Sequence, residues 1–166
     1  MSQVDSPALV ATVRTLFHEY EVAIAIDLEY QGFASELAAL PAPYVPPLGA
    51  LFVAHVGREA AGCVGLKPLD APRVGEMKRL YVRPAYRGAG LGERLVVAVI
   101  EAAQNAGYRE LRLDTLAGMA SAQALYRRLG FSEIPPYNSA PLPGTLFYSR
   151  RLSSGLPTQR TERPRR

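Results

Sequence analysis

The sequence has little of what several classes of protein depend on. It contains one cysteine, Cys63, so no disulfide can form within the chain, which is compatible with a reducing compartment. Its two histidines, His18 and His55, lie far apart, and no Cys, His and carboxylate residues have the spacing of a metal site. No apolar run approaches the roughly 18 residues of a membrane-spanning helix, and residues 1–7 do not resemble a signal peptide. We therefore expect a cytoplasmic protein with no membrane segment and no bound metal.

Charge is unevenly distributed along the 166 residues. The formal net charge is +4, but residues 153–166 hold four arginines and one glutamate, so most of the excess lies in this C-terminal tail. The tail has almost no apolar content, so we predict that it is disordered. The body of the chain is close to neutral, which disfavours a nucleic-acid partner.

The hydrophobic pattern predicts one α/β domain over residues 1–152. Ser6 and Pro7 are typical of an N-cap and a first helical residue, and helical spacing follows them. Gly107 and Gly130 stand where two later helices should end. The expected helices cover residues 7–20, 33–40, 91–106 and 120–129, and the expected strands residues 50–56, 60–66, 75–82, 111–114, 131–134 and 145–152.

The order strand, helix, strand over residues 75–114 implies a right-handed parallel crossover. The hairpin of residues 50–66 and the last two strands imply antiparallel neighbours on either side. We therefore predict a mixed, mostly antiparallel sheet with a central parallel strand pair, flanked by helices.

The most informative segment is the glycine-rich loop of residues 87–92, Arg-Gly-Ala-Gly-Leu-Gly, which precedes the longest predicted helix. Small residues at the start of a helix expose backbone N–H groups, and the helix dipole adds positive potential, so the loop suits a phosphate or pyrophosphate. A dinucleotide-binding loop would need glycine at position 93, which is glutamate, and a Walker loop would need an ending that is absent. A third pattern, Arg/Gln-x-x-Gly-x-Gly/Ala, is filled by Arg87, Gly90 and Gly92.

With this loop, residues 50–152 resemble the GNAT superfamily of acyl-CoA-dependent N-acetyltransferases. The resemblance includes Leu80-x-Val82-Arg83-Pro84, the strand of residues 111–115, and the pattern Ala122-x-x-Leu125-Tyr126-x-x-x-Gly130-Phe131. It implies the GNAT fold and acetyl transfer from acetyl-CoA to an amine that attacks directly in a ternary complex. The N-terminal segment is least alike, because the family usually begins with a strand and this chain has little room for one before its first helix.

The resemblance also implies where acetyl-CoA binds. The pyrophosphate would lie on the loop backbone, formed by Arg87, Gly88, Ala89, Gly90, Leu91, Gly92 and Glu93. Pantetheine would run along the strand edge at Leu80, Tyr81 and Val82, in place of a missing strand, and the N–H near Leu80 would serve as the oxyanion donor. Ser121 stands where the family often has asparagine near the pantetheine arm, which leaves that contact open.

Two side chains are candidates for proton transfer. Glu76 lies four residues before Leu80, at the position of a base in some family members, and would take the ammonium proton. The alternative is that Glu76 pairs with Lys78 or another cation on the sheet. Tyr126 corresponds to the family's tyrosine near the thioester sulfur, and its phenol would protonate the leaving thiolate; the alternative is an aromatic side chain packed in the core. Cys63 has no activating neighbour in sequence and is interpreted as a buried strand residue.

The acceptor side is less specified. Residues 7–40 are expected to form the helices of an acceptor pocket, beside a cofactor core of residues 50–152. Acidic and aromatic residues there would suit a cationic amine, although ordinary turns and core packing are the favoured interpretation. These residues are Asp27, Glu29, Tyr30, Phe33, Tyr137 and Asn138.

The sequence thus predicts an acetyl-CoA-dependent N-acetyltransferase acting on a small-molecule or peptide amine that it does not identify. The alternative is a non-catalytic acyl-CoA sensor or regulatory module, whose basic tail would reach an anionic partner. Homodimers are common in the family, but no residue in this chain demands one.

Overall fold

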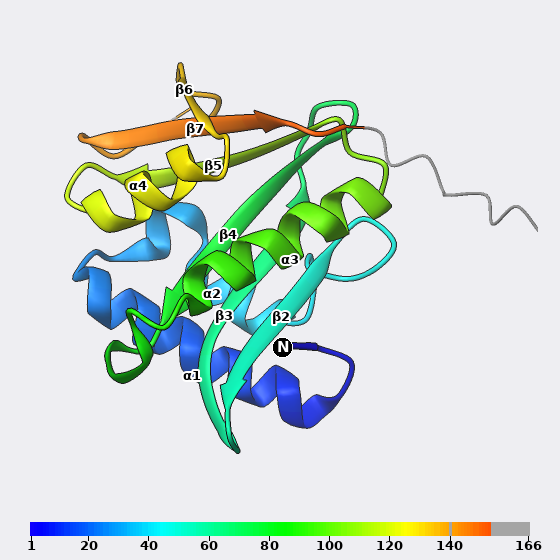
Figure 1. Cartoon of the computed structure of the whole chain (residues 1–166), viewed down its shortest axis with the longest axis vertical. Coiled ribbons are helices and arrows are strands. Elements are labelled where there is room, and N and C mark those ends of the chain that lie inside the picture. The colour runs from blue at the N-terminus through cyan, green and yellow to red at the C-terminus, as the bar shows by residue number, and fades with distance from the viewer. Residues whose placement is uncertain (140, 154–166) are drawn as a thin grey trace, which may run out of the picture.

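The computed structural model describes residues 1–139 and 141–153, which form a seven-stranded sheet with helices on both faces (Figure 1). Along the chain the elements are β1 (Ser2–Gln3), α1 (Pro7–Ile24), η1 (Leu28–Gln31), α2 (Phe33–Ala39), β2 (Ala50–Val56), β3 (Glu59–Pro68), β4 (Val74–Val82), η2 (Pro84–Tyr86), α3 (Leu91–Asn105), β5 (Glu110–Leu116), α4 (Ala120–Arg128), β6 (Ser132–Ile134) and β7 (Thr145–Arg151). The sheet order is β1-β2-β3-β4-β5-β7-β6, and within the described ranges β4 and β5 are its one parallel pair. This confirms the predicted mixed sheet with a central parallel pair.

Local sequence signals mark the start of α1 and the ends of α3 and α4 as predicted, whereas α1 continues to Ile24, beyond the predicted residue 20. Ser6 is extended, and its hydroxyl accepts a hydrogen bond from the Leu9 N–H at 3.4 Å, so α1 begins at Pro7. Gly107 and Gly130 both have φ of 82°, a left-handed conformation that glycine adopts without strain, beyond the ends of α3 and α4. These short-range rules need no tertiary contact, which explains why the sequence sufficed.

The N-terminus differs from expectation. The chain does have room for a strand before α1, because β1 needs only two residues and pairs Ser2 with Val53 and Gln3 with Phe52. Two polar residues carry no apolar alternation, so the sequence held no signal for this strand. β1 is held by its pairing with the edge of β2.

Two apolar cores lie on opposite faces of the sheet (Figure 1). On one face, α3 buries Leu95, Val96 and Val99 completely, and on the other, α1 buries Leu16 and Phe17 completely. Each such side chain stabilises the fold by about 1.5–3 kcal/mol relative to full exposure. The cores hold the central strands from both sides and so fix the positions of the groups along β4.

β4 and β5 are paired over a short stretch only. The register joins residues 74–76 of β4 to residues 110–112 of β5, and the strands then diverge toward α4 (Figure 1). β4 also bulges against β3, because Cys63 pairs with Tyr81 and Gly65 with Lys78, which leaves two β4 residues opposite one β3 residue. The divergence opens the sheet in its middle, and the bulge lies beside that opening.

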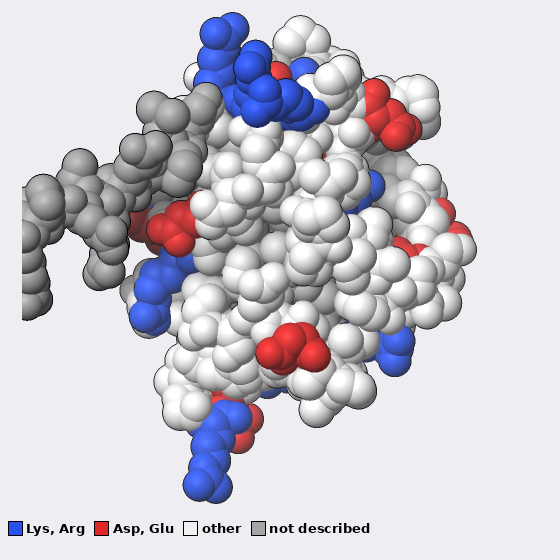
Figure 2. Space-filling view, turned by 90° about the vertical axis from the view of Figure 1, so that its right-hand side faces the viewer, with Lys and Arg blue, Asp and Glu red and all other residues white. Residues whose placement is uncertain are grey.

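The structure bears on the expectations about a membrane segment, surface charge and the C-terminal tail. In the described residues, no helix is long and apolar enough to cross a bilayer. As far as the described residues form it, the face in Figure 2 is mostly uncharged, with acidic and basic side chains interspersed and one basic group at its upper edge. The predicted disorder concerns residues 153–166, of which all but Ser153 lie outside the described part.

Candidate active site

A narrow slot of about 40 Å³ lies where β4 and β5 diverge. Residues 77–80 of β4 and residues 113–116 of β5 form its two sides, and Tyr126 of α4 lines it as well. The parallel ladder ends at Glu76 and Arg112, so the backbone groups that would continue it have lost that strand partner. An extended ligand with amide groups can take the place of the missing strand.

The glycine-rich loop stands at the start of α3. Gly88 and Gly90 have φ of 84° and 73°, and a Cβ added at either would meet no atom within 4 Å. Gly90 is the N-cap of α3 and makes no side-chain capping bond. The loop therefore borders open space at the N-terminal amides of a 15-residue helix, a geometry that could accommodate an anion.

Two charged residues of the loop have partners. Arg87 is exposed, and its Nε donates to the Val82 carbonyl at 2.9 Å, which holds the guanidinium over the end of β4. Glu93 forms an ion pair of 2.8 Å with Arg128 and so joins α3 to α4. Ser121, in the first turn of α4, is exposed.

Tyr126 is both a core residue and a wall of the slot. It is 5% exposed, and its ring packs against Phe131 and Tyr148 with centroid distances of 6.0 and 6.2 Å. Burial raises the pKa of the phenol, so Tyr126 is protonated at neutral pH. The structure thus brings Tyr126 and Leu80 into one slot.

A second, larger cavity of about 380 Å³ adjoins the slot. The residues that line both are Tyr30, Gln31, Lys78 and Arg79. Glu76 lines the larger cavity, whereas Tyr126 lines the slot, so the two proton-transfer candidates stand in adjoining spaces. Of the other residues suggested for the acceptor side, Tyr30, Tyr137 and Asn138 line the larger cavity.

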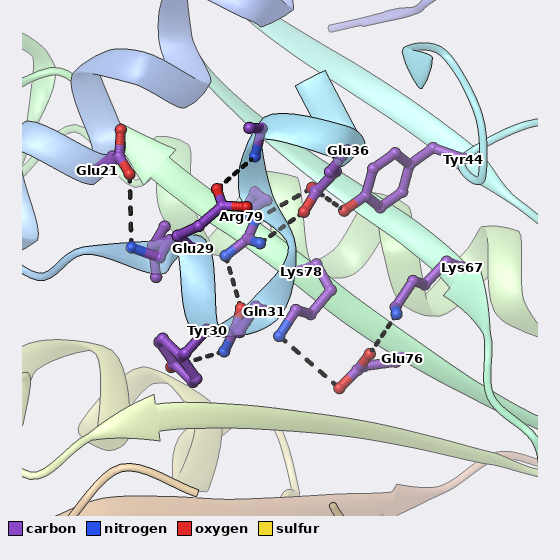
Figure 3. A network of polar contacts seen from close by, with 12 residues as sticks. Glu21, Glu29, Tyr30, Gln31, Glu36, Tyr44, Lys67, Glu76, Lys78 and Arg79 are labelled. Carbon is purple, nitrogen blue, oxygen red and sulfur yellow. Dashed lines mark hydrogen bonds and ion pairs between the residues drawn. The ribbon is translucent and has the colours of Figure 1, made fainter. Parts of the chain in front are cut away.

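Glu76 is held by several partners (Figure 3). It is 5% exposed, with Lys67 Nζ at 3.3 Å, Lys78 Nζ at 3.9 Å, and the Tyr137 hydroxyl donating to it at 2.8 Å. The pairing with Lys78 that the sequence offered as an alternative is therefore present at the longer of these distances. Burial raises the pKa of Tyr137, and Glu76 raises it further, so this hydroxyl stays a donor at neutral pH.

The Lys78–Asp114 ion pair spans the gap between the two diverging strands. Lys78 Nζ lies 2.9 Å from Asp114 Oδ1, and Gln31 Nε2 donates to Asp114 Oδ2 at 3.4 Å. Burial alone would lower the pKa of Lys78, but Asp114 and Glu76 hold it above its usual value. Asp114 was predicted only as a strand residue, because the pairing joins residues 36 positions apart.

Arg79 is a second residue that sequence reasoning missed. It is 5% exposed and donates to both carboxylate oxygens of Glu36, at 2.6 and 3.1 Å, and to Gln31 Oε1 at 3.0 Å (Figure 3). Its guanidinium lies 5.1 Å from the centre of the Phe33 ring. One signal was available: the consecutive cations Lys78 and Arg79 break the alternation of β4, which is typical of a bulge.

The remaining candidates have structural roles. Asp27 accepts from the Glu29 N–H at 2.8 Å and Glu29 from the Ala34 N–H at 3.1 Å, so both carboxylates cap the turns at η1 and α2. Cys63 is buried in β3, and burial raises the pKa of its thiol, in agreement with a structural cysteine. Among the described residues, no group of three His, Cys, Asp or Glu side chains could hold a metal ion.

Glu36→Gln should destabilise the protein by about 3 kcal/mol at neutral pH, because it leaves the buried Arg79 charge unpaired. Burial alone would raise the pKa of Glu36, but the hydrogen bonds and charge of Arg79 hold it below the ordinary 4.5. The contribution is therefore complete above pH 4.5 and is lost as pH falls through the folded-state pKa. Urea unfolding at pH 7 and pH 3 measures both effects.

Glu19→Gln is the control for this experiment. It breaks the 2.7 Å ion pair between Glu19 and Arg83, whose side chains are 33% and 27% exposed. The free energy of unfolding should fall by no more than about 1 kcal/mol. If Glu36→Gln and Glu19→Gln lowered the free energy of unfolding equally, burial would not explain the expected difference between the two ion pairs.

Comparison with known proteins places this site in a family. A sequence model of the acetyltransferase (GNAT) family matches residues 14–131. An uncharacterised N-acetyltransferase of Schizosaccharomyces pombe is 36% identical over 92% of this chain and 94% of its own length. A GNAT-family acetyltransferase from Staphylococcus aureus Mu50 superimposes with a TM-score of 0.74 at 23% identity, covering 92% of this chain and 99% of the other.

A further structural relative was solved with acetyl-CoA bound. The GNAT-family acetyltransferase from Elizabethkingia anophelis, solved with acetyl-CoA bound, has a TM-score of 0.53 at 24% identity, over 63% of this chain and 77% of the other. The family model spans well over half of the chain, the Schizosaccharomyces pombe relative is named an N-acetyltransferase, and the two GNAT-family structures share the fold. The chain belongs to the acetyltransferase (GNAT) family and is an acetyl-CoA-dependent N-acetyltransferase.

Proposed function

We propose that this enzyme transfers the acetyl group of acetyl-CoA to a primary amine, which attacks the thioester directly in a ternary complex. The observations that support the proposal are the slot in the opening between β4 and β5, lined by Leu80 and Tyr126, and the uncapped start of α3. The related structure with acetyl-CoA bound supports the same donor.

Acetyl-CoA would bind along residues named from the sequence. The amides of residues 87–93 would hold the pyrophosphate, and the edge of β4 at residues 80–82 would hold pantetheine, with Ser121 near that arm. The Leu80 N–H would donate to the oxygen that becomes negative when the carbonyl carbon is attacked. The acetyl group would then lie in the slot, within the reach of Tyr126.

The acceptor would enter through the larger cavity. Its volume of about 380 Å³ suits a small molecule or the end of a peptide. An ammonium group would first lose one proton to Glu76. The amine nitrogen would then bond to the carbonyl carbon, the C–S bond would break, and the sulfur would take the proton of Tyr126. Tyr126 would recover a proton from the nitrogen of the new amide. Glu76 would release the proton that it took from the ammonium group to water.

Glu76→Gln should lower kcat/KM for the amine by about a hundredfold at neutral pH, because the carboxamide cannot take the ammonium proton. Steady-state rates and CoA affinity are both measured. Glu110→Gln is the matched control, since Glu110 forms a 2.7 Å ion pair with Arg112 within β5 but lines neither cavity. Unchanged turnover with a lower melting temperature would leave Glu76 as a structural ion-pair residue only.

The proposed function is tested by release of free thiol from acetyl-CoA in the presence of a panel of amines. The panel contains an amino acid, a peptide N-terminus, a polyamine, an aminoglycoside and hydrazine. We expect amine-dependent release, together with CoA binding in calorimetry. CoA binding without release for any amine would favour the non-catalytic sensor, and absence of CoA binding would refute both.

A further inference from the structure

We propose that Arg79 is a positioning residue, whose side chain holds the bulge of β4 in the conformation that presents the Leu80 N–H to the slot. The inference rests on the proposed function, because the direction of this N–H matters for turnover only if the thioester lies in the slot. It concerns a side chain that would act through its own backbone rather than on the substrate.

The backbone of Arg79 is strained. Its φ is 59°, in the left-handed region, and of the three described non-glycine residues with positive φ it is the one inside a strand. Glycine commonly occupies the left-handed position of a β-bulge, because in any other residue the Cβ lies too close to the following backbone carbonyl oxygen. An arginine at this position requires contacts that compensate for the strain.

The side chain supplies those contacts. Glu36 of α2 binds the guanidinium through both oxygens, and Gln31 accepts a further hydrogen bond (Figure 3). The Phe33 ring also stacks on the guanidinium. Tyr44 donates to Glu36 and keeps the carboxylate in place. If the buried guanidinium left these partners, its positive charge would be unpaired in the protein interior, which is costly. The end of the side chain is therefore fixed, and it restrains the backbone of Arg79.

The bulge controls the next residue. In the described register, Arg79 and Leu80 have no paired residue on β3, and β5 has left β4 after Glu76. The buried Cys63 thiol of β3 donates to the Arg79 carbonyl at 3.6 Å, which adds a contact across the bulge. If the bulge relaxed to regular strand, the Leu80 N–H would turn with it, since a shift by one residue reverses the direction of the groups that follow.

The test replaces Arg79 by residues that differ in how well they tolerate positive φ. All of these replacements remove the contacts of the guanidinium. Arg79→Gly, Arg79→Asn and Arg79→Ala are compared in a Glu36→Gln background, where no variant leaves a buried charge unpaired. Thiol release is measured with hydrazine, a nucleophile small enough to need no contacts in the larger cavity, and CoA affinity and melting temperature are measured in parallel.

Glycine accepts φ of 59° without strain, asparagine accepts it at a small cost, and alanine does not. We expect turnover with hydrazine to rank Gly, Asn, Ala, with Ala about 5- to 30-fold below Gly, the ratio that the left-handed strain of one residue predicts. CoA affinity should change less than turnover across the series, because the amides of residues 87–93 would still hold the pyrophosphate. The Gly and Asn variants suffice for the ranking if the Ala variant does not fold.

Equal turnover of the three variants would overturn the inference, because Arg79 would then act through its charge or the shape of the cavity. Thiol release by the wild-type enzyme in the same assay separates this failure from failure of the proposed function. A wild-type enzyme that released no thiol with any amine would refute the proposed function, and the inference with it.

Discussion

Gly90→Val should weaken CoA binding by about a hundredfold or more. Gly90 has φ of 73° at the N-cap of α3, and the space next to its Cα is open. A valine side chain would fill the place where the pyrophosphate is proposed to lie and would displace it from the helix amides. Loss of two hydrogen bonds to a charged group, each worth about 1.5–3 kcal/mol, gives this magnitude. Titration calorimetry with CoA measures it.

Gly57→Val separates lost binding from general damage. Gly57 lies in the turn between β2 and β3 with φ of 58°, and a Cβ there also meets no atom within 4 Å. Both substitutions therefore carry a similar backbone strain of about 1–2 kcal/mol. Only Gly90→Val should lose CoA binding, whereas both should lower the melting temperature. If Gly90→Val bound CoA as the wild type does, the pyrophosphate site would have to lie elsewhere.

Tyr126→Phe should lower kcat by about a hundredfold while CoA affinity changes by less than about twofold. The substitution removes one hydroxyl and keeps the ring that packs against Phe131 and Tyr148. Because burial raises the pKa of this phenol, it is protonated and able to donate at neutral pH. Without it, the thiolate would leave unprotonated from a slot that holds little water. Steady-state thiol release and calorimetry together measure the two effects.

Tyr148→Phe is the matched control within the same aromatic cluster. Tyr148 is fully buried, and its hydroxyl accepts from Arg127 at 2.9 Å, but it does not line the slot. Its loss should therefore affect stability more than turnover. Similar turnover for Tyr126→Phe and wild type would remove the general-acid assignment and leave Tyr126 as a core residue.

Much of the fold followed from short-range rules. Ser6 and Pro7 start α1, Gly107 follows α3, and the order strand, helix, strand fixed the parallel pair. These predictions succeeded because each rests on backbone conformation or on the handedness of one crossover. β1 was not foreseen, since its pairing with β2 joins residues about fifty positions apart and leaves no periodic pattern.

The candidate site was predictable where main-chain groups form it and unpredictable where side chains meet. The loop of residues 87–92 was readable because glycine determines which amides are exposed. The division of Glu76 and Tyr126 between two adjoining cavities was not, because it depends on how far β4 and β5 diverge. Asp114 and Arg79 were missed because the residues that they bind come from distant segments of the chain.

The sequence by itself determined the family, the order of elements and the exposed glycine-rich start of α3, because local spacing and glycine conformations encode these features directly. Only the tertiary structure decided that Arg79 occupies a strained bulge and that Glu76 lies among Lys67, Lys78 and Tyr137. Buried charges take their partners from whatever the packed sheet and helices bring within reach, and one-dimensional spacing does not contain that information.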